Sequence, residues 1–133
     1  MSHCVVAKQS FSSGRFYYEV QVRGNTQWSL GVMRESVNRK RGIPWSPQCG
    51  FWTVELWGNQ YWAHADPSVL LTLREKVEKV GVFVDYEEGL VSFYDVESRS
   101  HIYSFTGQSF TEKLYPCFWT WSNNPLIITD VTE

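Results

Sequence analysis

One stretch of the chain, residues 80–95, constrains the possible folds more than any other. It reads VGVFVDYEEGLVSFYD, so two runs of β-branched and aromatic residues flank a short acidic segment that ends in glycine. Such runs are typical of paired strands, and Gly89 can adopt the positive φ that a tight turn needs. The stretch therefore predicts a β-hairpin whose turn lies at residues 86–89.

The same patterning recurs along the chain. Residues 16–23 alternate apolar and polar side chains, which gives one face suited to a core and one suited to solvent. Further short strands are predicted at residues 27–32, 51–57, 60–64, 80–84, 90–95, 102–105, 115–121 and 126–131. No long helix is expected, and at most a helical turn within residues 66–78. About ten short, regularly spaced strands predict an all-β, antiparallel β-sandwich.

Length and charge exclude several classes of protein. With 133 residues the chain is long enough for one domain with a real core, and its net charge of -2 gives no general attraction to nucleic acid. No apolar run could insert into a membrane, and no signal peptide is visible. The three cysteines, Cys4, Cys49 and Cys117, are odd in number and widely spaced. We therefore expect reduced thiols and a cytoplasmic protein.

The sequence contains no arrangement typical of catalysis or metal binding. Its Cys and His residues lack C-x-x-C and H-x-x-x-H spacing, and there is no phosphate-binding loop and no G-x-S-x-G motif. Some sandwich folds cleave sugars with two carboxylates, but Glu87 and Glu88 fall in a turn, and alternation points Glu55 outward. A hydrolase would need two carboxylates facing each other in a cleft. We expect no enzyme activity, no metal and no cofactor.

Aromatic residues make up 17% of the chain and include seven tryptophans. Those within strands are predicted to be core residues: Trp28, Trp52 and Trp62, together with Phe83. Trp45, Trp57 and Trp121 lie near predicted loops, where core packing and partner binding are both open interpretations. A tryptophan exposed on a loop is costly in water and can anchor an interface.

Several motifs occur in a recognisable order. Residues 13–20 read SGRFYYEV, which resembles the pattern S-G-R-x-Y-W-E-V with Tyr18 at the usual Trp. There follow WSLGV at 28–32, RESVNRK at 34–40, GFWTV at 50–54 and VDYE at 84–87, the last resembling an L-D-Y-E motif. Together they are similar to the SPRY domain of the PRY-SPRY type, found in tripartite-motif (TRIM) ubiquitin ligases, butyrophilins and some fish NACHT-type innate receptors.

The resemblance implies a bent antiparallel two-sheet β-sandwich, concanavalin-like and non-catalytic, that recognises a protein through loops at one end. Those loops correspond to residues 34–50, the turn near Gly58, residues 64–72 and residues 119–125. The basic cluster 39–41 is explained either by a solvated loop or by a partner contact. The residues expected to contact a protein partner are Arg39, Lys40, Arg41, Trp45, Trp57, His64, Trp119, Trp121, Asn123 and Asn124.

Two departures from the family pattern affect these expectations. The PRY segment with its L-D-P motif is missing, and the loop before Pro125 is shorter than usual. We expect residues 1–133 to form a SPRY domain, the C-terminal part of a longer protein, that self-associates through edges left open by the missing segment. The leading function is target recognition for a TRIM-type ubiquitin ligase or an innate immune sensor. The alternative is lectin-like carbohydrate binding, since sugar rings also stack on exposed tryptophan.

Overall fold

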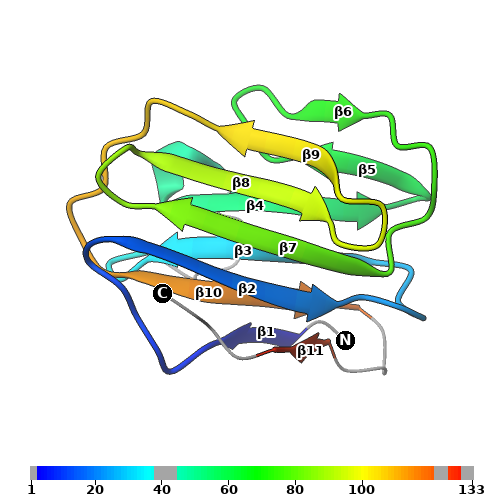
Figure 1. Cartoon of the computed structure of the whole chain (residues 1–133), viewed down its shortest axis with the longest axis horizontal. Coiled ribbons are helices and arrows are strands. Elements are labelled where there is room, and N and C mark those ends of the chain that lie inside the picture. The colour runs from blue at the N-terminus through cyan, green and yellow to red at the C-terminus, as the bar shows by residue number, and fades with distance from the viewer. Residues whose placement is uncertain (1–2, 38–44, 122–125, 130–133) are drawn as a thin grey trace.

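The computed structural model describes residues 3–37, 45–121 and 126–129, which form two antiparallel sheets packed face to face (Figure 1). The strands of the described residues are β1 His3–Val6, β2 Arg15–Gln21, β3 Trp28–Arg34, β4 Phe51–Trp57, β5 Gln60–Ala63, β6 Val69–Leu71, β7 Lys79–Asp85, β8 Leu90–Asp95, β9 Ser100–Phe105, β10 Leu114–Thr120 and β11 Ile127–Ile128. The predicted all-β sandwich is confirmed.

Residues 66–78, where at most a helical turn is expected, contain none. That segment contains strand β6, which pairs with β5, and the helical turn of the described residues is instead a 3-10 helix, η1, at Pro47–Cys49. Its sequence explains this local structure. Pro47 fixes φ at the first helical position, and Gly50 ends the turn in the left-handed region at φ 90°.

The strand order places distant parts of the chain side by side. Sheet A has the order β1-β10-β3-β4-β5-β6 and sheet B the order β11-β2-β7-β8-β9. In Figure 1, sheet B lies in front of sheet A. The predicted hairpin of residues 80–95 is the β7–β8 pair, in which Val84 lies opposite Val91 and Gly89 takes φ 70° at the turn.

The core lies between the sheets and follows the period-two pattern. Phe16, Tyr18 and Val20 of β2 are fully buried, and they pack in one cluster with Leu30 and Val54 of sheet A. Full burial of such a side chain contributes about 1.5–3 kcal/mol. Burial of the apolar side chains that alternate along the strands therefore contributes most of the free energy that stabilises the packing of the two sheets.

Tyr18 occupies the position where the family pattern usually has Trp, and its hydroxyl has a hydrogen-bond partner inside this core. Its hydroxyl donates a hydrogen bond to the backbone carbonyl of Gly31, and burial raises the pKa of the phenol well above its ordinary value. Glycine is required at position 31 because the backbone of the neighbouring strand leaves no room for a side chain. A Cβ at this position would lie 2.0 Å from the carbonyl oxygen of Trp52 on the neighbouring strand.

The predicted core aromatics are partly correct. Trp28 and Trp52 are buried, as predicted, whereas Trp62 is only half-buried. The prediction for Phe83 is wrong: it is half-buried and pairs with Tyr17 and Ser92 on the outer side of sheet B. Because Val82 and Val84 point into the core, the residue between them must point away from it.

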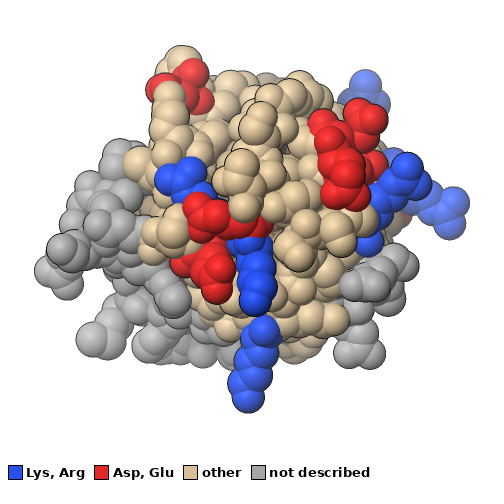
Figure 2. Space-filling view, turned by 90° about the vertical axis from the view of Figure 1, so that its left-hand side faces the viewer, with Lys and Arg blue, Asp and Glu red and all other residues tan. Residues whose placement is uncertain are grey.

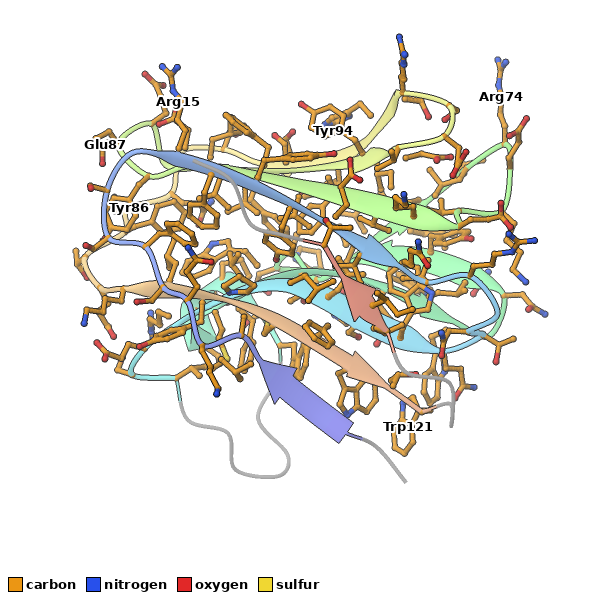
Figure 3. The ribbon with its side chains drawn as sticks, turned by 60° about the horizontal axis from the view of Figure 1, so that its bottom comes forward. Arg15, Arg74, Tyr86, Glu87, Tyr94 and Trp121 are labelled. Carbon is orange, nitrogen blue, oxygen red and sulfur yellow. The ribbon has the colours of Figure 1, made fainter. Side chains whose placement is uncertain are left out.

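The first and the last of the family motifs meet at one end of the sandwich, which we call the motif end (residues 13–15 and 85–87). Gly14 N donates to Glu87 Oε1 at 2.7 Å, and Arg15 Nε donates to Asp85 Oδ2 at 3.0 Å. The Tyr86 hydroxyl donates to the Glu112 carbonyl at 2.7 Å. Figure 3 shows Arg15, Tyr86 and Glu87 together at this end, and Figure 2 shows acidic and basic side chains intermixed on it. These hydrogen bonds therefore connect the start of β2 to the β7–β8 hairpin.

Candidate functional site

The outer face of sheet A carries a row of side chains that crosses five strands. The register places Trp119, Ser29, Glu55, Trp62 and Leu70 opposite one another on β10, β3, β4, β5 and β6. Side chains of directly opposed residues project from the same side of a sheet. Their strand neighbours Leu30 and Val54 point into the core, so the row points away from it.

A second row beside the first is also rich in tryptophan. Trp57 and Trp121 meet edge to face, with ring centroids 6.0 Å apart, and Trp121 lies 4.6 Å from Trp119. Trp57 is 45% exposed, Trp121 39% and Leu70 49%. We call the set formed by Ser29, Glu55, Trp57, Trp62, Leu70, Trp119 and Trp121 the aromatic face. Exposed apolar side chains grouped in this way mark binding sites.

Trp45 forms one border of the aromatic face. Its ring stacks on Phe51 with a centroid distance of 4.7 Å and tilts against Trp119 at 5.9 Å. Phe51 belongs to a small buried cluster on this side of sheet A with Met33 and Cys117. Trp45 is half-buried and packed against both rings, which supports the packing interpretation, while partner binding by Trp45 stays a prediction.

The carboxylate of Glu55 lies in the row between Trp119 and Trp62. Glu55 Oε2 accepts a hydrogen bond from Ser29 Oγ at 3.1 Å, and it lies 3.3 Å from His64 Nε2. The Glu55 and His64 side chains are each 19% exposed. The predicted outward orientation of Glu55 is confirmed. The arrangement can accept hydrogen bonds from a bound group and can supply a negative charge.

The segments 45–50 and 64–68 converge next to this face. They line a pocket of about 480 Å³ whose walls are Trp45, Ser46, Gln48, Cys49, His64, Ala65, Asp66, Pro67 and Ser68. A hydrogen bond from Gln48 Nε2 to Asp66 Oδ2 joins the two segments. Two of the predicted binding loops therefore meet in space, although they are separated in the sequence.

The structure brings together four tryptophan and histidine positions predicted from the sequence, namely Trp57, His64, Trp119 and Trp121, with Trp45 at the border. Arg39, Lys40, Arg41, Asn123 and Asn124 were also predicted and lie outside the described residues. Sequence reasoning missed Ser29, Trp62 and Leu70, because only the register shows that they share a row with Glu55. That all these residues contact a partner stays a prediction.

The described residues contain no group of three His, Cys, Asp or Glu side chains that could hold a metal ion. None of the helices in that part of the chain is long and apolar enough to cross a membrane. Cys49 has a free, half-buried thiol and Cys117 is buried. The expectation that all three cysteines are reduced stays a prediction, because the side chain of Cys4 is not described.

Comparison with known proteins identifies the family. The SPRY domain model matches residues 15–130, and the chain belongs to the SPRY family. It is 45% identical over 132 residues to butyrophilin subfamily 1 member A1 of Bos taurus, which covers 98% of this chain and 25% of the relative. It is 43% identical over 116 residues to zinc finger protein RFP of Homo sapiens, covering 86% of the chain and 23% of the relative. The chain thus spans about a quarter of these relatives' length.

Solved structures show the same fold. The crystal structure of the TRIM65 PSpry domain matches with a TM-score of 0.82 at 24% identity, covering 96% of this chain and 68% of the other. The SPRY domain of human HERC1 matches with a TM-score of 0.69 at 20% identity, covering 97% and 82%. The bent two-sheet sandwich expected from the sequence motifs is therefore confirmed, and the family supports a role as a protein-interaction module.

Proposed function

We propose that this domain is a non-catalytic module that binds a protein partner through the aromatic face. The observation that carries the proposal is the exposure of Trp57, Trp121 and Leu70 on one side of a paired sheet. Tryptophan is enriched among the residues that dominate interface energies. An exposed group of this kind is expensive for a domain to keep unless a partner covers it.

The sandwich supports binding by fixing the positions of these side chains before the partner arrives. Trp57 is on β4, the strand next to β3 in the middle of sheet A, and Trp121 directly follows β10. Trp45 is held by its stack on Phe51. Side chains that are already ordered lose less entropy on binding, which raises the affinity that a given contact area provides. Residues 39–41 and 123–124, which lie outside the described residues, are proposed as additional contacts.

We further propose that the parent protein uses this domain to recognise targets, as a cytoplasmic TRIM-type ubiquitin ligase or an innate immune sensor. The likeness to zinc finger protein RFP and to the TRIM65 PSpry domain supports this assignment. The chain spans only about a quarter of its relatives. The parent's activity must therefore be tested with the parent protein itself.

A paired-variant interaction experiment tests the binding proposal. Proteins captured from cytosol by the wild-type domain are compared with those captured by the variant W57A/W121A and by I127A as a matched control. Ile127 is 55% exposed on β11, which belongs to sheet B, whereas the aromatic face lies on sheet A. We expect specific partners to be lost with W57A/W121A and kept with I127A, while thermal melts of both variants stay near the wild type. Equal capture by all three proteins, or binding only on a glycan array, would reject the proposal.

A further inference from the structure

We propose that the aromatic face takes a basic side chain of its partner, an arginine or a lysine within an extended segment, with Glu55 as the counter-charge. The inference rests on the proposed function and names the chemistry of the partner. It comes from the position of one carboxylate within a surface that is otherwise built mainly of indole rings and Leu70.

The hydrogen bonding of Glu55 leaves part of its carboxylate available. Among the described residues Ser29 Oγ donates to Oε2 at 3.1 Å, and His64 Nε2 lies 3.3 Å from the same oxygen without making a hydrogen bond. A carboxylate has about four acceptor sites on its two oxygens. Oε1 has no described partner, and the side chain is 19% exposed, so a donor from outside can reach the group. A bound partner would also shield the carboxylate from water, which makes a matching donor necessary.

The surroundings of Glu55 favour a cation over an anion or an apolar group. Trp62 lies directly opposite Glu55 on β5, and Trp119 lies next to Ser29 on β10. The faces of aromatic rings carry negative potential and attract cations. The aromatic face contains no lysine or arginine, and the described contact of His64 is with Oε2, so Oε1 stays available to a cation from the partner. An anion would be repelled, and an apolar group would bury the charge without a partner.

Arginine fits this site better than lysine. A guanidinium is planar, so it can stack on an indole while it donates two parallel hydrogen bonds to a carboxylate. A lysine ammonium can satisfy the charge but cannot stack in the same way. We therefore expect arginine to be preferred, with lysine next.

The size of the row indicates an extended segment of partner chain. From β10 to β6 it crosses four strand-to-strand spacings, which is about 19 Å at about 4.8 Å each. An extended chain covers that distance with roughly six residues. Leu70 at one end of the row, and Trp119 with its neighbour Trp121 at the other, suit apolar side chains on both sides of the basic one.

A peptide selection tests the inference directly. A random twelve-residue library displayed on phage is selected on the wild-type domain, and the enriched peptides are synthesised with arginine and with citrulline, its neutral isostere. Binding is measured to wild type, E55Q and E19Q. Glu19 is a matched control because it is a strand carboxylate, 25% exposed, on the outer side of sheet B. A thermal melt accompanies each variant.

We expect the selected peptides to share arginine or lysine, and citrulline to weaken binding to the wild type about tenfold, as loss of a charge-assisted hydrogen bond would. E55Q should weaken the arginine peptide by a similar factor and remove the difference between arginine and citrulline, while E19Q changes neither. The citrulline comparison on the wild type stands even if E55Q folds poorly.

The opposite results are equally clear. Peptides without a basic residue, acidic peptides, or arginine peptides that bind E55Q as tightly as the wild type would overturn the inference. The proposed function survives those results if W57A still abolishes binding. A library that gives no binder sensitive to W57A would reject the proposed function, and the inference with it.

Discussion

The motif end and the aromatic face differ in how their side chains are used. At the motif end the charged groups are taken up by internal contacts: Asp85 accepts from Arg15, and Glu87 accepts from the Gly14 amide. On the aromatic face Trp57 and Trp121 stay 45% and 39% exposed. The residues that make the family recognisable thus hold the fold together. Most of the residues that we propose to bind a partner, such as Glu55, Trp57 and Trp121, lie outside the motifs.

The largest effect on stability should come from the core beneath these two regions. Replacing Trp52 by alanine should lower the free energy of unfolding by about 3–5 kcal/mol. Trp52 is 4% exposed, its Nε1 donates to Gln108 Oε1 at 3.0 Å, and its ring contacts Phe110 edge to face. Chemical denaturation measures the loss. Phe83→Ala on the outer side of sheet B is the control and should cost clearly less; equal costs would contradict the assignment of the two positions.

The next effect separates binding from stability. Trp57→Ala and Trp121→Ala should each weaken partner binding by about 2 kcal/mol, as truncation of an interface anchor does. Their unfolding free energies should change much less than that of Trp52→Ala, because both rings are already partly in water. Calorimetric titration and denaturation of the same samples give both values. If Trp57→Ala and Trp121→Ala unfolded as easily as Trp52→Ala while binding the partner normally, the distinction between binding residues and core residues would be wrong.

A variant at the motif end should show the converse behaviour. Tyr86→Phe removes the hydroxyl that donates to the Glu112 carbonyl at 2.7 Å, which should cost about 1 kcal/mol of stability. Partner affinity should be unchanged, because Tyr86 lies at the end of the molecule shown in Figure 3 on the side opposite to Trp121. A loss of affinity without a loss of stability would place the motif end in the binding site.

A smaller effect is expected from pH at the same end. Hydrogen bonds from Ser36 Oγ and the Ser36 amide lower the pKa of Glu112 below its ordinary value. A carboxylate with a lowered pKa in the folded state stabilises the fold above its ordinary pKa, and this contribution is lost as pH falls through the lowered value. The stability difference between wild type and Glu112→Gln should therefore shrink as pH drops below about 4.5. A difference that stays constant down to pH 2 would contradict this assignment.

Self-association should be the weakest of these effects. Among the described residues, β9 and β11 end sheet B, and Ile127 on β11 is 55% exposed. An uncovered strand edge can pair with a second chain. We expect sedimentation velocity to show concentration-dependent dimers for residues 1–133, reduced by Ile127→Lys. A strict monomer at high concentration would reject this proposal.

The fold was predictable because each strand carries its own signal. Alternation along residues 16–23 and the hairpin of residues 80–95 indicate strands locally, and the ordered motifs name the family. The misplaced features have local causes. Val69–Leu71 pairs with β5 and so forms an edge strand. Its sequence is so short that it is also compatible with a helical turn. The sequence-based prediction places Phe83 in the core because it is a large aromatic residue. Its neighbours Val82 and Val84 point into the core, so alternation directs Phe83 to the outer side.

The candidate site was predictable only in part, because it depends on the register between strands. The sequence pointed to Trp57, His64, Trp119 and Trp121 by their closeness to loops. It could not show that Trp119 and Glu55 lie in one row. The two residues are far apart in the sequence, and they share a row because both strands pair with β3. Cross-strand neighbours are set by pairing over long distances, and a single sequence does not contain that information.

Strand β4 gives the domain a means to change ligand without changing its fold. Its residues alternate between the two sides, with Trp52, Val54 and Leu56 buried in the core and Glu55 and Trp57 on the outer face. Substitutions of Glu55 and Trp57 are therefore expected to leave the sandwich intact and to alter what the surface recognises, whereas Phe51 and Thr53 on the same side are buried. Gly31 marks the limit of this freedom, because any side chain there would collide with the backbone of β4. A binder library that randomises positions 55, 57, 62 and 119 and keeps Gly31 would use the domain as a ready scaffold.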